Sequence, residues 1–337
     1  MSRAIRSNLL KALAAAVACG PAACGPAEPT GGRGGPGGAR TVVATSTLCT
    51  DLARTVCDGV PGVRVEGLMP AGVDPHLWRP TDGGARALAR ADVVVANGLR
   101  LEGRMADVLP RLARSGCTVF EASSAIPMDR WRVEDGSGGH ADPHVWMDPA
   151  LWAFAAEGLA EALARKDPAN AARYRANAAA FGARSEQVSR RVRAAVGTIP
   201  PSRRLLVTAH DAFGYFGGAF GIEVRGVQGL STESETGLAG LRALTDEVVA
   251  RGVPAVFVET TVPDRAVDAL VEGAAARGAA LANGGTLHSD ALGPPGSAAE
   301  DWEGMMLSNA RTVVTALGGD ASGLADERPR TRTEGDR

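Results

Sequence analysis

The stretch DPHVWMDP, residues 142–149, and the shorter DPHLW, residues 74–78, share an Asp-Pro-His opening. In both, a proline precedes the histidine; proline fixes its own φ and pushes the residue before it away from helical backbone. We therefore expect His76 and His144 on stiff, non-helical loops. Because the chain has only five histidines, this matched pair is the strongest sign of a site that binds a metal or a ligand.

Short apolar strands alternate with helices on both sides of residues 142–149. The expected strands cover residues 41–46, 63–69, 92–96, 118–120, 204–208, 223–227, 255–259 and 279–282. The expected helices cover residues 47–58, 82–90, 101–112, 149–165, 212–220, 237–251, 264–277 and 298–317. Such alternation is typical of βαβ units and of parallel sheets.

A long helix is expected between the two halves. Asp167-Pro168 has the form of an N-cap followed by proline at the first helical position, and helical sequence continues from Ala169 to Val196. We therefore predict an α/β fold with two similar lobes joined by one long rigid helix. The predicted divisions are an N-terminal lobe at 41–166, a linking helix at 167–199, a C-terminal lobe at 200–319 and a disordered tail at 320–337.

Three histidines and one aspartate lie at or after expected strand ends, two in each half: His76, His144, His210 and Asp290. In open α/β sheets, sites form beyond the carboxyl ends of the strands, so these side chains are expected to meet between the lobes. Three imidazoles and a carboxylate suit a divalent cation such as zinc. Taken singly, a loop histidine is more often structural than a metal ligand, and no local spacing rule such as HExxH supports this set.

The N-terminus has the features of an export signal. Arg3, Arg6 and Lys11 accompany the apolar run 9–18, although a lysine within such a run is unusual. The run ends in a sequence that resembles a bacterial lipoprotein processing site, so we predict a leader at residues 1–19 and lipidation of Cys19, with cleavage without lipid as the alternative. The Gly- and Pro-rich residues 20–40 are predicted to be a flexible tether to the membrane surface.

Composition excludes several other functions. The formal net charge of −2 gives no footprint for nucleic acid or for a basic membrane-binding surface. No CxxC pair indicates a thiolate metal site. Cys49 and Cys57 lie eight residues apart on one expected helix, about 12 Å, which is too far for a disulfide. Pairing of Cys57 with Cys117 stays open, with small buried hydrophobic groups as the alternative.

Seven strings of the sequence resemble, in order from Thr41 to Gly319, the motif series of the zinc- and manganese-binding solute receptors of bacterial ABC transporters (cluster A-I). The strings are GVDPHLWRPTD, ANGLRLEGRM, DPHVWMDP, TAHDAFGYF, GLSTESETGL, VFVETTV and GGTLHSDALG. The resemblance implies two α/β lobes linked by one helix, and metal ligands at His76, His144, His210 and Asp290. It also implies an extracytoplasmic monomer that captures a metal ion and delivers it to a membrane permease.

The resemblance also guides the choice of metal. Relatives with glutamate at the position of His210 are associated with manganese and those with histidine more often with zinc, and imidazole nitrogen does suit zinc better. We therefore expect zinc as the transported ion, with manganese as the alternative. His140 is expected to be solvated, because the loop lacks the His-rich insertion of many zinc-type relatives, and His288 to replace a packing aromatic. A zinc hydrolase is the remote alternative, because Asp290 would fill the position that an enzyme leaves open for water.

Overall fold

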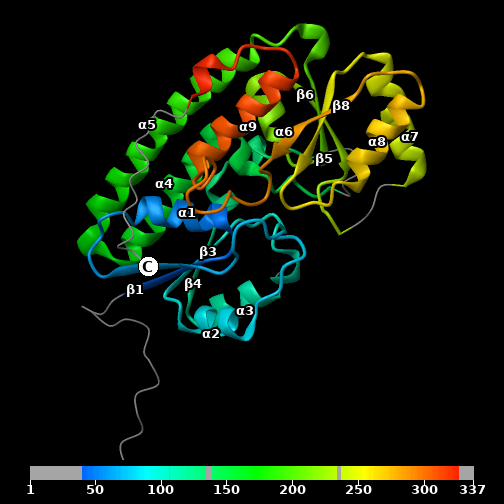
Figure 1. Cartoon of the computed structure of the whole chain (residues 1–337). Coiled ribbons are helices and arrows are strands. Elements are labelled where there is room, and N and C mark those ends of the chain that lie inside the picture. Colours follow the sequence, from blue (N-terminus) through cyan, green and yellow to red (C-terminus); the bar gives the residue numbers. More distant parts are fainter. Residues whose placement is uncertain (1–39, 106, 134–138, 234–236, 326–337) are drawn as a thin grey trace, which may run out of the picture. The chain divides into compact units, whose positions relative to one another are not determined.

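Two four-stranded parallel sheets form the framework of the computed structural model, which describes residues 40–105, 107–133, 139–233 and 237–325 (Figure 1). The first sheet has the order β2-β1-β3-β4, with β1 Arg40–Ala44, β2 Val63–Gly67, β3 Val93–Ala96 and β4 Thr118–Glu121. The second has the matching order β6-β5-β7-β8, with β5 Leu205–His210, β6 Glu223–Gln228, β7 Ala255–Glu259 and β8 Ala282–Leu287. The predicted class, two similar α/β lobes with parallel sheets, is confirmed.

The helices begin where the sequence provides capping side chains. They are α1 Thr47–Val56, α2 Asp82–Arg90, α3 Val108–Arg114, α4 Pro149–Lys166, α5 Ala171–Val196, α6 Gly214–Phe220, α7 Leu238–Ala250, α8 Arg265–Ala275 and α9 Trp302–Ala316. The side chains of Ser46, Thr81, Asp148 and Asp301 each accept a hydrogen bond from a backbone N–H in the first turn of the helix that follows. These caps explain why several expected helix starts agree with the structure.

Two expected elements differ markedly from the structure. The helix expected over residues 101–112 is divided into a 3-10 turn, Gly103–Met105, and α3, because Pro110 lacks the N–H that a continuous helix would need. The strand expected at 279–282 begins only at Ala282. Its glycines resemble a turn in sequence, but a Cβ on Gly284 would lie 2.7 Å from the Phe257 ring and 2.9 Å from Ala316 Cβ. Close packing, and not turn formation, therefore requires glycine there.

A core shared by both lobes lies between the sheets. Successive side chains of a strand point to opposite faces, so Val42 and Ala44 enter the shared core while Val43 faces α2 and α3. From the second lobe, Leu206 and Phe257 enter the shared core, and α7 and α8 cover the other face. The described residues therefore form one compact unit and not two separately packed halves.

The long helix α5 contains 26 residues, about 39 Å, and runs alongside α4 (Figure 1). It begins at Ala171, after a 3-10 turn at Pro168–Asn170, slightly later than expected. Asn177 donates to the carbonyl of Val56 in the first lobe, and Arg184 Nε lies 2.6 Å from Glu303 Oε1 in the second. The helix is therefore packed along both lobes and is not an isolated strut.

Two buried tryptophans join the lobes, and we call Trp146 and Trp302 the tryptophan seam. Trp302 Nε1 donates to the carbonyl of Trp146 at 2.9 Å, and Trp146 Nε1 donates to the carbonyl of Ser289 at 2.9 Å. The backbone N–H of Trp302 donates to Asp51 Oδ2 at 3.2 Å. Because both indoles are fully buried with their N–H groups satisfied, the seam fixes the lobes to each other.

The C-terminal segment and the cysteines also bear on the predictions. A disordered tail was expected from residue 320, but Ser322–Leu324 form a 3-10 turn and Leu324 is fully buried, so that prediction is wrong for these residues.

Cys49 and Cys57 are buried thiols, and burial raises the pKa of each to about 12. Cys117 donates to the carbonyl of Thr118. The predicted leader, Cys19 and most of the predicted tether lie outside the described residues.

No helix within the described ranges combines the length and the apolar character needed to cross a lipid bilayer.

Candidate metal centre

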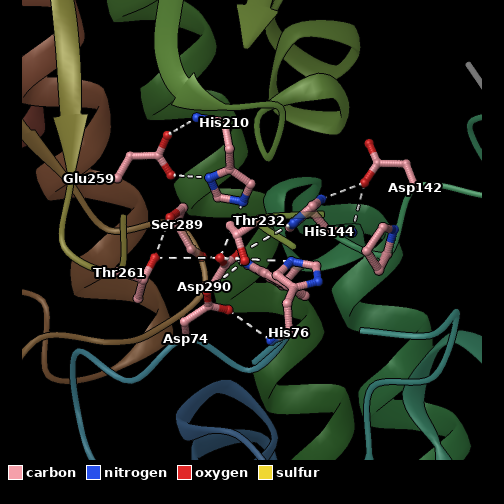
Figure 2. Close-up of polar contacts among 12 residues, drawn as sticks. Asp74, His76, Asp142, His144, His210, Thr232, Glu259, Thr261, Ser289 and Asp290 are labelled. Carbon is pink, nitrogen blue, oxygen red and sulfur yellow. Dashed lines mark hydrogen bonds and ion pairs between the residues drawn. The ribbon is translucent and has the colours of Figure 1, made fainter. Parts of the chain in front are cut away.

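Four buried side chains from four separate segments converge on one point (Figure 2). They are His76, in the loop after β2; His144, just before the 3-10 turn Val145–Met147; His210, the last residue of β5; and Asp290, after β8. One nitrogen or oxygen atom from each lies within 4.8 Å of the others. The structure thus brings together the full set that the sequence predicted as ligands.

The imidazoles point their Nε2 atoms at the carboxylate. Asp290 Oδ1 lies 3.3 Å from His144 Nε2, while Oδ2 lies 3.2 Å from His210 Nε2 and 3.9 Å from His76 Nε2. Beyond these approaches, none of the three Nε2 atoms has a hydrogen-bond partner in the described part of the chain. Buried polar atoms are normally satisfied, so three orphaned nitrogens facing a carboxylate fit a cation that all four groups would share.

The Asp-Pro-His sequence builds the same turn twice. Asp74 Oδ1 accepts a hydrogen bond from the backbone N–H of His76 at 2.8 Å, and Asp142 Oδ1 accepts one from that of His144 at 2.9 Å. An aspartate that binds the N–H two residues later forms an Asx turn. With the proline between them, this turn holds each histidine on the stiff, non-helical loop that the sequence predicted.

Two carboxylates orient the His144 and His210 rings by contacting Nδ1, the ring nitrogen that faces away from Asp290. Asp142 Oδ1 lies 2.7 Å from His144 Nδ1, and Glu259 Oε2 lies 2.6 Å from His210 Nδ1. Glu259 Oε1 also accepts the backbone N–H of His210 at 2.8 Å. A carboxylate at Nδ1 keeps the proton on that nitrogen and directs the Nε2 lone pair into the site, as is usual for histidines that bind metals.

The same carboxylates set the charges of the site. Burial lowers the pKa of His144, but the hydrogen bond and charge of Asp142 outweigh it and raise the pKa to about 9. At His210, the charges of Glu259 and Asp290 outweigh burial and hold the pKa well above its usual value. At His76, burial outweighs the charge of Asp290 and lowers the pKa to about 3. Burial raises the pKa of Asp290, yet the nearby charges of His210 and His144 hold it well below its usual value.

Further residues support the site from behind. Asn97 Nδ2 donates to the carbonyl of Pro143 at 2.8 Å, beside His144. Buried Glu102 in turn accepts hydrogen bonds from the backbone N–H of Asn97 at 2.7 Å and from Thr45 Oγ1 at 2.6 Å. Thr261 Oγ1 donates to Asp290 Oδ2 at 3.4 Å.

Sequence reasoning did not assign roles to Asp74, Asp142 or Glu259. The Asp of each Asp-Pro-His copy is itself a signal, because an aspartate two residues before a ligand can form an Asx turn. Glu259 ends a strand next to the one that ends at His210, but only the sheet order reveals that proximity.

The two remaining histidines lie outside the cluster. His140 is exposed, as expected for a solvated loop residue. His288 is half-buried; its backbone N–H donates to Asn309 Oδ1 at 2.9 Å, and its carbonyl accepts from Asn309 Nδ2 at 2.7 Å. Burial lowers the pKa of its imidazole. This environment fits the predicted packing group.

Known proteins resemble this chain over both lobes. The family described as zinc-uptake complex component A, periplasmic (ZnuA), matches residues 42–316. Manganese-binding lipoprotein MntA of Bacillus subtilis is 38% identical over 276 residues, which are 82% of this chain and 89% of that protein. Zinc-binding protein TroA of Treponema pallidum is 37% identical over 277 residues, 82% of this chain and 88% of that protein. A solved structure of periplasmic TroA aligns with a TM-score of 0.79 at 36% identity, covering 83% of this chain and 99% of that one.

Proposed function

The chain belongs to the ZnuA family of metal-binding receptors of ABC transporters, and from this premise we propose that His76, His144, His210 and Asp290 bind the transported ion. The ion would be a single divalent transition metal, captured outside the cytoplasm and delivered to a membrane permease. The observation that carries the proposal is the convergence of three orphaned Nε2 atoms on one buried carboxylate. Ligands from both lobes mean that the ion would bridge them.

Zinc is the ion that we propose. Three neutral nitrogen ligands and one carboxylate suit it, and a given site of nitrogen and oxygen ligands binds zinc more tightly than manganese. The likeness to a manganese-binding lipoprotein at 38% identity favours manganese as the second candidate. Asp290 presents both of its oxygens to the histidines. This arrangement also suits manganese, which prefers more oxygen ligands than zinc does.

A receptor explains the site better than a hydrolase does. A catalytic zinc keeps one position open for water, and an enzyme also needs a general base within reach. In the proposed site Asp290 would occupy the fourth position, and Glu259 faces Nδ1 of His210, on the far side of the ring from Nε2. The matched relatives are likewise named for metal binding and not for catalysis.

Attachment to the membrane is the remaining part of the proposal. Lipidation of Cys19, followed by the tether at 20–40, would hold a monomeric receptor beside its permease at the outer face of the cytoplasmic membrane. The description of MntA as a lipoprotein supports this arrangement.

A competition titration of the metal-stripped protein with zinc and manganese at neutral pH tests the proposal. We expect one equivalent of zinc to bind with nanomolar affinity or tighter, and manganese to bind far more weakly. Comparable manganese affinity would favour the second candidate. Absence of stoichiometric binding of either ion would overturn the receptor function. His140→Ala is a control in the N-terminal lobe. Because His140 is exposed and lies outside the cluster, this variant should bind zinc as the parent does.

A further inference from the structure

One hydrogen bond connects the His76 loop to the opposite lobe. Thr232, in the loop between β6 and α7, donates from Oγ1 to Asp74 Oδ2 at 2.6 Å (Figure 2). The other oxygen of the same carboxylate, Oδ1, accepts the backbone N–H of His76 at 2.8 Å. Asp74 thus joins a candidate metal ligand of the first lobe to a hydroxyl of the second.

The equivalent carboxylate of the other motif binds its own histidine and not a hydroxyl of the second lobe. Asp142 binds the backbone and the ring of His144 through Oδ1, and its Oδ2 lies 4.0 Å from Arg132 Nε. Asp142 is fully buried, whereas Asp74 is only partly buried. The Asp142 carboxylate is therefore oriented by its own histidine, and the second lobe contacts Asp142 through its backbone, where the Tyr215 hydroxyl donates to the Asp142 carbonyl at 3.2 Å. The Asp74 carboxylate, in contrast, is itself bound by a side chain of the second lobe.

We propose that Thr232 is a positioning residue for His76, acting through Asp74 from the opposite lobe, and that breaking this hydrogen bond is a step in metal release. The inference rests on the proposed binding of the metal by His76. A hydrogen bond to a charged carboxylate is stronger than one between neutral groups. While it persists, Asp74 holds the His76 loop against the second lobe; once it breaks, His76 can leave while three ligands remain.

The kinetic consequence follows from when the bond exists. The Thr232–Asp74 bond belongs to the closed arrangement in which all four ligands meet, so its loss should accelerate dissociation more than it slows association. Loss of a hydrogen bond to a charged group should raise the dissociation rate by about tenfold or more.

The experiment is a stopped-flow measurement of zinc release into excess chelator from the full protein. Thr232→Val keeps the shape and removes the hydroxyl, and we expect about tenfold faster release. Thr232→Ser keeps the hydroxyl, and we expect release within about twofold of the parent. In an Asp74→Ala background, adding Thr232→Val should cause no further acceleration, because the carboxylate through which Thr232 acts is already absent.

Thr312→Val is the matched control. Thr312 Oγ1 donates to the carbonyl of Ser308 within α9, so the same chemical change there should leave release unchanged. Circular dichroism and thermal melting of the metal-free variants would confirm that each is folded.

The possible failures can be told apart. Unchanged release from Thr232→Val, with one equivalent of zinc still bound, would overturn the inference and leave the proposed function standing. Acceleration that persists in the Asp74→Ala background would also overturn it, because Thr232 would then act by another route. A parent protein that binds no stoichiometric zinc would overturn the proposed function itself.

Discussion

The two Asp-Pro-His loops differ in how far their aspartates control the ligand. Both aspartates hold the backbone N–H of the histidine, but only Asp142 also reaches the ring nitrogen of its histidine, at 2.7 Å. Asp74 instead directs its second oxygen to Thr232. The same motif therefore yields one ligand whose ring is held by the aspartate of its own loop, and one whose aspartate is bound by a side chain of the other lobe. This difference predicts unequal stiffness of the two ligands.

Removing each histidine should reveal this difference most strongly. Changing an outer partner of a metal ligand costs about 10–100-fold in affinity, so loss of either His76 or His144 itself should cost more than about 100-fold. The two variants should differ, however, in how far they destabilise the metal-free protein. His144→Ala leaves the buried carboxylate of Asp142 without its ring partner and should lower the free energy of unfolding by about 3 kcal/mol.

His76→Ala should be milder for stability, because the pKa of His76, about 3, keeps its ring neutral and its loss strands no buried ion pair. Zinc titration and denaturant unfolding of both metal-free variants check this. Equal losses of stability would mean that the two loops are held alike.

Changing the aspartates comes next in size. Asp142→Asn removes the charge at His144 Nδ1 and should weaken zinc binding by about 10–100-fold. Glu259→Gln should do the same through His210. Asp74→Asn should cost less than about tenfold, because the Asp74 carboxylate contacts His76 only through its backbone N–H, its other oxygen being bound to Thr232. A competition titration ranks the three. If Asp74→Asn were as harmful as Asp142→Asn, ring orientation would not be what separates the loops.

The pH dependence of zinc binding should follow the protonation of the His144 ring. Its pKa of about 9 means that the metal-free ring carries a proton at neutral pH, which a metal must displace. Zinc affinity should therefore rise by about tenfold per pH unit below pH 9 for each proton displaced. Proton release measured in two buffers checks this, and Asp142→Asn should shift the rise to lower pH.

Stability of the metal-free protein should change in the opposite direction. A histidine pKa raised from 6.5 to about 9 by folding stabilises the protein fully below pH 6.5 and loses that contribution as pH rises towards 9. Melting temperatures that increased between pH 7 and 9 would contradict the raised pKa.

The sequence predicted the two lobes, the sheet class and the meeting of four ligand residues, because these depend on local patterns. Strand ends and proline positions are local, and parallel strands end at a common edge. What it could not predict depends on contacts distant in the chain. The shared core is one such feature. The tryptophan seam is another, since it joins residues 146 and 302 and no local pattern indicates that pairing.

The difference between the expected strand at 279–282 and β8 has the same cause, a contact that is distant in the chain. Its Asn283-Gly284-Gly285 sequence is typical of a turn, yet it forms a strand that pairs with β7. Glycine is needed at position 284 because β7 and α9 lie too close for a side chain. Likewise Thr232 looks like an ordinary polar loop residue until the fold places it 2.6 Å from Asp74.

The smallest effect should come from the ion pair beside the His76 loop. Arg104 Nε lies 3.1 Å from Glu233 Oε1 across the lobes, next to the Thr232 contact, but the two side chains are 41% and 47% exposed. Exposed pairs contribute little and are screened by salt. Arg104→Gln should therefore change zinc release by less than about twofold, and less still at high ionic strength. Release measured at low and high salt, beside Thr232→Val, separates the two contacts. A tenfold effect of Arg104→Gln that salt abolished would mean that the Arg104–Glu233 ion pair, and not the Thr232–Asp74 hydrogen bond, holds the His76 loop against the second lobe.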